Sequence, residues 1–290
     1  MKIGFIGLGK MGSGVCSNLI KNGYDTTVYD ISDEAMKRFD GKARLANSDV
    51  ELFKMCDVTF LSLPGYPEVE EMTDKFLSVG VKGKAVIDLS TSTPMSSKAI
   101  HAKFKAAGGD YLDAPLTGTP VHAAEGKLAV NVGGDKEDFD KYKSIIDCFA
   151  RATNYIGSAG AGNVVKLVNN YIGILTSAIC AEAFTLVEKM GYDVERVFTI
   201  IQDSSVDSLA YRNAVSNMCI KKSFNHGFTV NFCLKDLSYF KMLFEEIKAP
   251  SFVLDGALNV YKLARIMGLG DKGATEVVKV AYRNVGIDIE

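Results

Sequence analysis

A glycine-rich turn close to the N-terminus is the feature that most constrains the fold of this chain. The motif Gly7-Leu8-Gly9-Lys10-Met11-Gly12 follows an apolar run over 2–6 and opens a helical pattern over 11–21. In a strand–turn–helix unit, the first glycine of G-x-G-x-x-G permits a tight turn, the second lets the backbone approach a pyrophosphate, and the third allows close helix–strand packing. The diphosphate then binds at the free N–H groups and positive dipole end of the helix. Three glycines in a turn are often only structural, so the flanking strand and helix are what favour a dinucleotide site.

An acidic residue ends the second apolar run, where a dinucleotide-binding unit needs one. Asp30 closes the run over 26–30, and Ile31 and Ser32 follow it. A carboxylate at this place accepts hydrogen bonds from the adenosine ribose hydroxyls and repels a 2′-phosphate. Because no adjacent arginine offers to neutralise such a phosphate, the sequence favours NAD over NADP as the cofactor. The same geometry also suits Asp30 as a helix or turn cap.

Short apolar runs alternate with helical patterns through the first half of the chain. Strand-type runs occur at 2–6, 26–30, 58–63, 85–89, 110–113, 128–132 and 154–156, and helical patterns at 11–21, 33–39, 49–55, 67–76 and 96–107. This alternation is typical of right-handed crossovers between parallel strands. We therefore predict an α/β fold in which residues 1–160 form an NAD-binding Rossmann-type domain with a doubly wound, mainly parallel sheet.

The second half carries helical patterns only. After a small, flexible segment at 157–162, one helical pattern runs over 163–190 and ends at Gly191, and others follow at 194–202, 235–247, 251–267 and 274–285. A helix of this length can support a domain of its own. We predict that residues 161–290 form a second, all-helical domain, joined to the first by a long interdomain helix and serving substrate binding or oligomerisation.

Composition excludes several classes of protein. The 290 residues carry a formal net charge of −2, which gives no general attraction to nucleic acid or anionic lipid. Hydrophobic residues make up 47% of the chain, enough to exclude disorder as the dominant state. The apolar runs are short and broken, below the roughly 18 residues that span a bilayer, and the first residues lack the pattern of a signal peptide. We expect a cytoplasmic protein that binds neither nucleic acid nor membrane.

The cysteines and histidines do not form a metal-binding pattern. The six cysteines are scattered without a C-x-x-C pair, and His101, His122 and His226 form no ligand pair. We therefore expect no metal site, and thiols that are reduced and mostly buried.

Two later strand ends are expected to face the same cofactor. Leu63-Pro64 and Ser90-Thr91 each follow an apolar run directly. Ligands of open parallel sheets bind beyond the carboxyl ends of the strands. The proline fixes the path of the chain after its strand, and Thr91 supplies a hydroxyl near the nicotinamide ribose. Without other context, either segment also reads as an ordinary turn.

A polar stripe on the long helix, and a loop before it, are the candidates for substrate binding. The loop over 113–119 follows a strand and is rich in small residues whose amides and hydroxyls could hold a carboxylate. On the helix, Lys166, Asn169 and Asn170 share one face of an otherwise apolar segment. Such a stripe needs polar partners if it is buried. A solvated face at the edge of the domain is the alternative.

Four segments, in this order, resemble the β-hydroxyacid dehydrogenases typified by 3-hydroxyisobutyrate dehydrogenase. Residues 6–12 resemble the cofactor signature of that family, and 113–126 resemble its substrate loop. Residues 160–170 are similar to the segment that bears its active-site lysine, and Leu234-Lys235-Asp236-Leu237 resembles its C-terminal Lys-Asp element. The resemblance covers nearly the whole chain.

The resemblance implies a role for each matching residue. Lys166 would be the general acid/base, sharing a proton with the substrate hydroxyl while a hydride moves between the substrate and the nicotinamide. Thr117 and Gly118 would help hold the substrate carboxylate, and Asn170 would orient the substrate. Thr119, in the same loop, is a further candidate for substrate binding. Lys235 would reach toward the nicotinamide end of the cofactor. Because an ammonium with a pKa of about 10.4 accepts no proton at neutral pH, the pKa of Lys166 is expected to be lowered by partial burial and a neighbouring cation.

Two departures from the family pattern bear on the substrate. The usual Ser-Gly-Gly of the substrate loop is Thr117-Gly118-Thr119 here, and His122 stands where a glycine is common. The added side chains narrow the loop. His122 either pairs with an anionic group of the substrate or is a plain loop histidine.

The favoured interpretation is an NAD-preferring enzyme that interconverts a small β-hydroxy acid and its semialdehyde. Candidate substrates are 3-hydroxyisobutyrate, glycerate with tartronate semialdehyde, 4-hydroxybutyrate and sulfonated analogues. The resemblance also implies a homodimer or homotetramer formed through the helical domain.

Related groups of proteins offer alternatives. Decarboxylating 6-phosphogluconate dehydrogenases have histidine three residues after the lysine, where this chain has Asn169, and are much longer. Imine reductases generally lack the lysine, as do the catalytically silent, nucleosome-associated members of the superfamily. A silent NAD-binding or scaffolding protein is the alternative of a different class.

Overall fold

The computed structural model describes residues 1–224 and 228–289. The chain divides into two compact units, Met1–Lys166 and Leu167–Glu290. We call them the sheet unit and the helical unit. The division falls inside one long helix, α8 (Ala161–Lys189), whose first turn belongs to the sheet unit.

The sheet unit is built on a mainly parallel sheet. Within the described residues, nine strands form it in the order β3-β2-β1-β4-β5-β6-β8-β7, with β9 paired to β8. Pairs from β3 to β6 along this order are parallel, whereas β8 is antiparallel to β6 and β7 and parallel to β9. The strands are β1 (Ile3–Ile6), β2 (Thr26–Tyr29), β3 (Arg44–Leu45), β4 (Val58–Leu61), β5 (Ala85–Asp88), β6 (Asp110–Asp113), β7 (Leu116–Thr117), β8 (Leu128–Gly133) and β9 (Ala150–Gly157).

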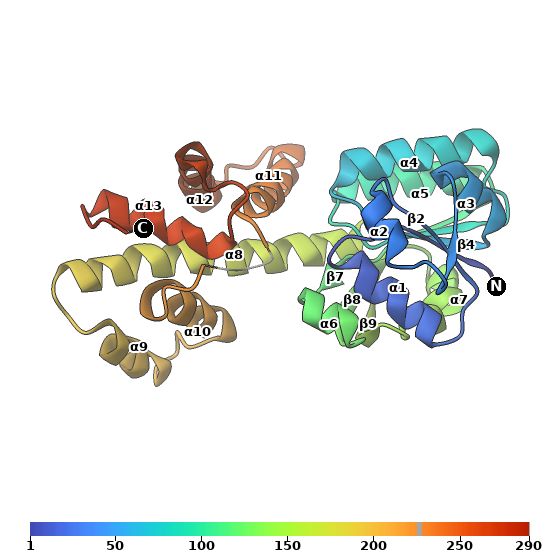
Figure 1. The fold of residues 1–290 in the computed structure, drawn as a ribbon. Coiled ribbons are helices and arrows are strands. Elements are labelled where there is room, and N and C mark those ends of the chain that lie inside the picture. The colour runs from blue at the N-terminus through green and yellow to red at the C-terminus, as the bar shows by residue number, and fades with distance from the viewer. Residues whose placement is uncertain (225–227, 290) are drawn as a thin grey trace. The chain divides into compact units, whose positions relative to one another are not determined.

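Helices cover both faces of this sheet, as Figure 1 shows for α4 and α5 on one side and α1 and α7 on the other. Successive strand residues therefore enter different cores: Phe5 packs in the cluster with α1 and α7, and Ile6 in the cluster with α3, α4 and α5. The central strands β1, β4 and β5 are buried throughout, as expected for parallel strands covered on both faces. The helices are α1 (Gly12–Lys21), α2 (Asp33–Lys37), α3 (Asp49–Met55), α4 (Tyr66–Val79), α5 (Pro94–Ala106), α6 (Pro120–Ala124) and α7 (Lys136–Ile146).

Several helices begin where the sequence signals a start. The side chain of Ser32 accepts a hydrogen bond from Ala35 N, that of Ser48 from Glu51 N, and that of Thr93 from Ser96 N. Each bond satisfies one of the free N–H groups of a first helical turn.

The helical unit packs around the apolar side of α8. Its core joins Ile174, Leu175 and Phe184 of α8 to buried residues of α10, α11 and α12. The remaining elements are α9 (Val194–Gln202), α10 (Leu209–Val215), the π-helical turn η1 (Ser216–Ile220), α11 (Val230–Glu246), α12 (Phe252–Ala264), the π-helical turn η2 (Arg265–Leu269), the 3-10 turn η3 (Ala274–Val277) and α13 (Val278–Asn284). The predicted fold, a Rossmann-type sheet followed by a helical region, is confirmed.

The helix α8 differs from expectation in one respect. By length and composition alone it is suited to cross a membrane. Only 28% of its apolar 18-residue window is buried in the structure. Core helices of soluble proteins also pass this test, but those helices are mostly buried. The exposed apolar residues of α8 therefore need an explanation.

Candidate active site

The glycine loop has the shape that a dinucleotide needs. A Cβ atom added at Gly7 would lie 2.2 Å from Ser62 O, and one added at Gly12 would lie 1.9 Å from Gly7 O, so close packing demands both glycines. At Gly9, in contrast, no atom of the described residues lies within 4 Å of such a Cβ. The backbone of Gly9 thus has open space beside it, at the start of α1. This space fits the approach of a pyrophosphate to the helix N-terminus.

Two charged side chains hold Leu8, the buried residue between the first two glycines. Asp30 Oδ2 accepts a hydrogen bond from Leu8 N at 2.5 Å, and Asp30 Oδ1 accepts one from Ser32 N at 2.8 Å. Arg38 Nη2 donates to Leu8 O at 2.5 Å. Asp30 therefore lies beside the glycine loop, where an adenosine ribose is expected, and it also caps a turn. Arg38 lies eight residues after Asp30, so the residues that directly follow Asp30 in the sequence do not reveal it.

The two later strand ends lie on the same edge of the sheet as the glycine loop. The strands β1, β4 and β5 are neighbours, and their carboxyl ends lead into Gly7, Leu63 and Thr91. Leu63 N donates to Ser90 Oγ at 2.9 Å, so the two loops are hydrogen-bonded to each other. Pro64 and Lys10 are exposed, and Met11 and Thr91 are partly exposed. The sheet thus brings all the cofactor residues predicted in this unit to one edge.

The lysine predicted to be catalytic lies at the substrate loop. Lys166 Nζ donates to Leu116 O at 2.7 Å, and the next residue is Thr117. The Lys166 side chain is half-buried. Thr117 Oγ1 is buried and has no hydrogen-bond partner among the described residues. A half-buried ammonium and an unpartnered buried hydroxyl therefore lie at adjacent residues of β7, which is a polar site suited to a ligand.

The rest of the substrate loop is held by a helix cap. Gly118 has a backbone φ of +143°, a conformation that residues with a side chain rarely adopt. Thr119 is the N-cap of α6: its hydroxyl accepts a hydrogen bond from His122 N, and Thr119 N donates to His122 Nδ1 at 3.1 Å. This is a capping box with histidine at the third position. His122 accordingly stabilises the loop through its Nδ1 atom and its backbone N–H.

A buried aspartate fixes the start of α8, and with it Lys166. Asp113, the last residue of β6, accepts hydrogen bonds from Gly160 N at 2.6 Å and from Asn163 N at 2.9 Å. Burial raises the pKa of the Asp113 carboxyl, although these N–H donors oppose the rise. A carboxylate at a helix N-terminus is stabilised by the free N–H groups and the helix dipole. Lys166 follows Asn163 by three residues, so its position depends on this cap.

In the helical unit, Asn170 is hydrogen-bonded to a buried aspartate. Asn170 Nδ2 donates to Asp236 Oδ2 at 2.6 Å, and Asn169 Nδ2 donates to Asn170 Oδ1 at 3.2 Å. Lys235 Nζ lies 3.3 Å from Asp236 Oδ1 and within 6 Å of the Phe232 and Tyr239 rings. An ionised aspartate only accepts hydrogen bonds, which fixes the orientation of the Asn170 amide. No specific role for Asp236 was predicted from the sequence, although it lies in the Lys-Asp element.

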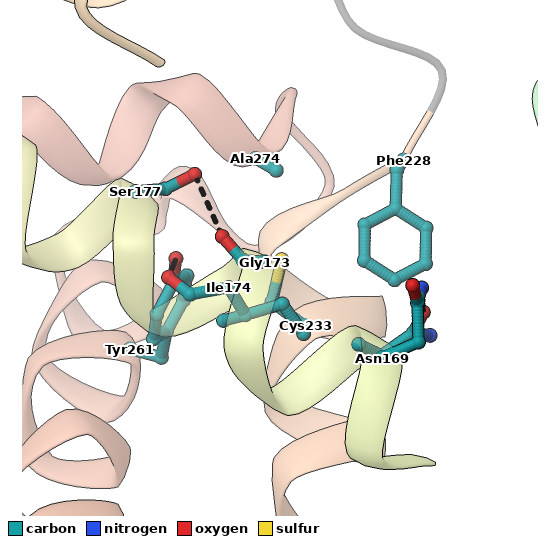
Figure 2. Close-up of a pocket in the computed structure, with 9 residues that line it drawn as sticks. Asn169, Gly173, Ile174, Ser177, Phe228, Cys233, Tyr261 and Ala274 are labelled. Carbon is teal, nitrogen blue, oxygen red and sulfur yellow. Dashed lines mark hydrogen bonds between the residues drawn. The ribbon is translucent and has the colours of Figure 1, made fainter. Parts of the chain in front are cut away.

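A cavity of about 220 Å³ opens beside these asparagines. Figure 2 shows Phe228 facing Asn169 at one end, with Gly173 and Ser177 further along α8. Cys233, Ile174 and Tyr261 supply apolar walls. Gly173 and Ser177, which continue the helix face of Asn169 and Asn170, thus line this cavity.

The structure shows no group of three or more His, Cys, Asp or Glu side chains that could hold a metal ion within residues 1–224 and 228–289. His226 lies outside the described residues.

A Rossmann-type sheet with an open glycine loop, followed by a helix that carries a lysine beside an unpartnered hydroxyl, defines a dinucleotide-dependent oxidoreductase. Comparison with known proteins identifies the family. Residues 2–157 match the model of the NAD-binding domain of 6-phosphogluconate dehydrogenase, and residues 160–281 match that of NADP-dependent 3-hydroxyisobutyrate dehydrogenase.

Individual relatives agree with these family models. The 2-hydroxy-3-oxopropionate reductase of Escherichia coli is 32% identical over 82% of this chain and 82% of its own length. The 2-(hydroxymethyl)glutarate dehydrogenase of Eubacterium barkeri is 29% identical over 100% of this chain and 97% of its own. The solved structure of Mycobacterium tuberculosis 3-hydroxyisobutyrate dehydrogenase with L-serine has a TM-score of 0.88 at 26% identity, covering 96% of this chain and 98% of that one.

The chain therefore belongs to the 3-hydroxyisobutyrate dehydrogenase-like family of β-hydroxyacid dehydrogenases, NAD(P)-dependent enzymes that act on CH–OH groups. The resemblance read from the sequence is confirmed.

Proposed function

We propose that this chain interconverts a small β-hydroxy acid and its semialdehyde, with Lys166 as the general acid/base. The observation that carries the proposal is the hydrogen bond from Lys166 Nζ to Leu116 O, which holds the ammonium next to the unpartnered hydroxyl of Thr117. The substrates named for the relatives, 2-hydroxy-3-oxopropionate and 2-(hydroxymethyl)glutarate, are small acids of this kind.

Each residue of the substrate loop has a separate task in this proposal. The Thr117 hydroxyl donates a hydrogen bond to the carboxylate of the substrate, which satisfies an otherwise unpartnered buried group. The positive φ of Gly118 and the capping box of Thr119 and His122 hold the loop in shape. Thr119 thus acts through loop geometry, because its hydroxyl and its amide are both used in the cap.

Lys166 moves the proton. In the direction of reduction, its ammonium donates a proton to the aldehyde oxygen as that oxygen gains negative charge, and in oxidation the neutral amine takes the proton back. The Leu116 carbonyl oxygen accepts a hydrogen bond from Lys166 Nζ, and this bond orients the other N–H bonds of the ammonium. When bound, the nicotinamide ring supplies or takes up the hydride.

Asn170 orients the substrate. Its amide is held by Asp236 on one side and by Asn169 on the other, so its second N–H has a fixed direction that we assign to an oxygen of the substrate. Asn170 follows Lys166 by four residues in the sequence of α8.

The cofactor preference proposed is NAD, with NADP as the less favoured cofactor. The carboxylate of Asp30 beside the glycine loop supports this preference, because it attracts ribose hydroxyls and repels a 2′-phosphate. Gly7, Gly9 and Gly12 would hold the pyrophosphate, and Leu63, Pro64 and Thr91 would lie against the nicotinamide half. Lys235 is proposed to contribute at the nicotinamide end.

A homo-oligomer is part of the same proposal. Four exposed apolar residues of α8 and one directly after it repeat at spacings of four and seven and form one stripe: Val168, Ile172, Ile179, Leu186 and Met190. A stripe of this kind on a helix is typical of a surface that another helix covers. We assign it to a second copy of this chain.

The experiment that tests the activity is a substrate screen with purified protein. We expect oxidation of NADH by at least one short semialdehyde, with tartronate semialdehyde, succinic semialdehyde, methylmalonate semialdehyde and sulfonated aldehydes in the panel. Tight binding of NADH without turnover of any member would instead favour the catalytically silent, NAD-binding protein.

A further inference from the structure

A fully buried carboxylate lies behind the cofactor loops. Asp88 ends β5, and its side chain is 0% exposed. Asp88 Oδ1 accepts a hydrogen bond from Ser90 N at 2.9 Å, and Asp88 Oδ2 accepts from Ser92 Oγ at 3.1 Å and from Tyr111 Oη at 3.2 Å. Within residues 1–224 and 228–289, no lysine, arginine or histidine forms an ion pair with it. Burying an unpaired charge is unfavourable, so its persistence calls for a reason.

The partners of Asp88 connect it to the first of the two cofactor loops. Ser90 donates a hydrogen bond from its backbone N–H to Asp88. The hydroxyl oxygen of Ser90 in turn accepts a hydrogen bond from Leu63 N at 2.9 Å. Leu63 belongs to the loop after β4, and Ser90 precedes Thr91 in the loop after β5. One carboxylate therefore stands behind both strand ends that are proposed to hold the nicotinamide half of the cofactor.

A second branch leads from Asp88 to the first turn of α8. Ser92, whose hydroxyl bonds Asp88, donates its backbone N–H to Asn163 Oδ1 at 2.9 Å. Asn163 Nδ2 in turn donates to Ser97 Oγ at 3.1 Å. Ser92, Ser97 and Asn163 are all 0% exposed, so water does not compete for these bonds. Lys166 follows Asn163 by one turn.

We propose that ionised Asp88 is a positioning residue that sets the cofactor loops after β4 and β5 and the first turn of α8 in register with one another. A carboxylate is suited to this task because it only accepts hydrogen bonds. Both hydroxyls, those of Ser92 and Tyr111, must therefore point their protons at it. Once Asp88 is protonated, one of its oxygens becomes a donor and the neutral carboxyl accepts hydrogen bonds more weakly, so its hold on the N–H of Ser90 and the hydroxyls of Ser92 and Tyr111 is loosened. The proposal rests on the assignment of the loops at Leu63 and Thr91 to the cofactor site.

The switch between the two forms falls in an accessible range of pH. Burial raises the pKa of Asp88 to about 6, against the opposing effect of the hydrogen bonds from Ser90, Ser92 and Tyr111. The titratable groups that face it come from β6: Tyr111, whose pKa burial raises well above its usual range, and Asp113, its register partner. His101 of α5 bonds Tyr111 O and not Asp88. Within the described residues, β4, α5 and the first turn of α8 supply no titratable hydrogen-bond partner to Asp88.

The test is the pH dependence of cofactor affinity, which needs no turnover. Because the chain contains no tryptophan, the fluorescence of NADH can be titrated directly, with NADPH as a second probe. We expect the Kd of the parent protein to rise about 3- to 10-fold as pH falls from about 7.5 to about 5.5, the effect of losing one hydrogen bond. In Asp88→Asn, which keeps an acceptor oxygen but does not titrate, Kd should be flat over this range and equal to the low-pH value of the parent.

Two further variants keep the test decisive if Asp88→Asn fails to fold. Tyr111→Phe removes one donor to the ionised carboxylate, so the midpoint of the Kd profile should move to higher pH. Asp74→Asn makes the same chemical change at an exposed carboxylate of α4 and should leave the profile of the parent unchanged. A parent Kd that does not vary with pH, or a profile that survives in Asp88→Asn, would overturn the proposal. Neither result would touch the proposed dehydrogenase activity, which the substrate screen tests separately.

Discussion

Two side chains of opposite charge meet at Leu8 in the cofactor loop. Asp30 accepts its N–H, and Arg38 donates to its carbonyl oxygen. The carboxylate favours a ribose with free hydroxyls, whereas the guanidinium is a group that commonly binds phosphate. We therefore expect both residues, which contact the same loop, to influence the choice between NAD and NADP.

For Asp30→Ala, we expect the NADP/NAD ratio of kcat/KM to rise about tenfold or more, because a hydrogen bond to a charged group is lost for NAD and a repulsion is removed for NADP. Arg38→Ala, in the Asp30→Ala background, should reverse part of that rise. Steady-state kinetics with both cofactors measure the ratio. An unchanged ratio in Asp30→Ala would exclude Asp30 from the ribose site.

The hydroxyl of Thr117 is buried and has no hydrogen-bond partner among the described residues, and we propose that it binds the substrate. For Thr117→Val, which keeps the shape, we expect KM for the substrate to rise about tenfold while the melting temperature does not fall. Thr117→Ser should retain most of the affinity. A drop in melting temperature together with an unaltered KM would mean that the hydroxyl serves the fold instead.

The raised pKa of the buried Asp88 carboxyl leads us to expect that the stability of the protein depends on pH. That pKa is about 6 in the folded chain and 3.8 in the absence of the fold, so the folded state binds the proton more tightly. Stability from this group is therefore present at low pH and is lost as pH rises from about 4 to about 6, by at most about 3 kcal/mol. Asp88→Asn should thus gain melting temperature relative to the parent on going from about pH 4.5 to about pH 7. Parallel curves for the two proteins would contradict the buried charge.

Whether a strand or helix could be predicted from the sequence depended on its length and on how much of it is buried. The central strands were evident because they are apolar throughout, whereas β3 has two residues, both exposed, and leaves no apolar signal. The antiparallel pairing of β8 depends on contacts distant in sequence, so no local pattern reveals it. The helix α10 was missed although it carries a signal: Ser208 caps it, and Tyr211, Ala214, Val215, Met218 and Cys219 are buried at helical spacing.

The residues of the candidate site that belong to sequence motifs were predictable, whereas those outside the motifs were not. The glycine loop, Asp30 and Lys166 belong to motifs that can be recognised in the sequence, and the sheet gathers the residues predicted to bind the cofactor at one edge. Arg38 and the Asp88 network are not contiguous with any motif. Ser92 and Asn163 are 71 residues apart, and only the folded sheet brings them into contact.

At the scale of the whole molecule, the exposed stripe of α8 predicts self-association. Ile172 and Ile179 are 59% and 62% exposed. Their simultaneous replacement by lysine should place two charges in the contact and dissociate the oligomer, which light scattering after size-exclusion chromatography measures as a lower mass. Ile266→Lys, at an 81% exposed apolar residue of η2, is the matched control. An unchanged mass would exclude the stripe as the interface, and binding of the parent to lipid vesicles would favour a membrane partner instead.

All of the proposed chemistry depends on the amine of Lys166 acting on the substrate and not on the cofactor or the fold. The most direct measurement compares Lys166→Ala with the parent in two quantities, kcat for the best semialdehyde and Kd for NADH, with exposed Lys127→Ala as control. We predict that kcat falls at least about 100-fold while Kd for NADH changes less than about twofold. A kcat within a few-fold of the parent, or a loss of NADH affinity that accounts for the lost rate, would contradict the assignment.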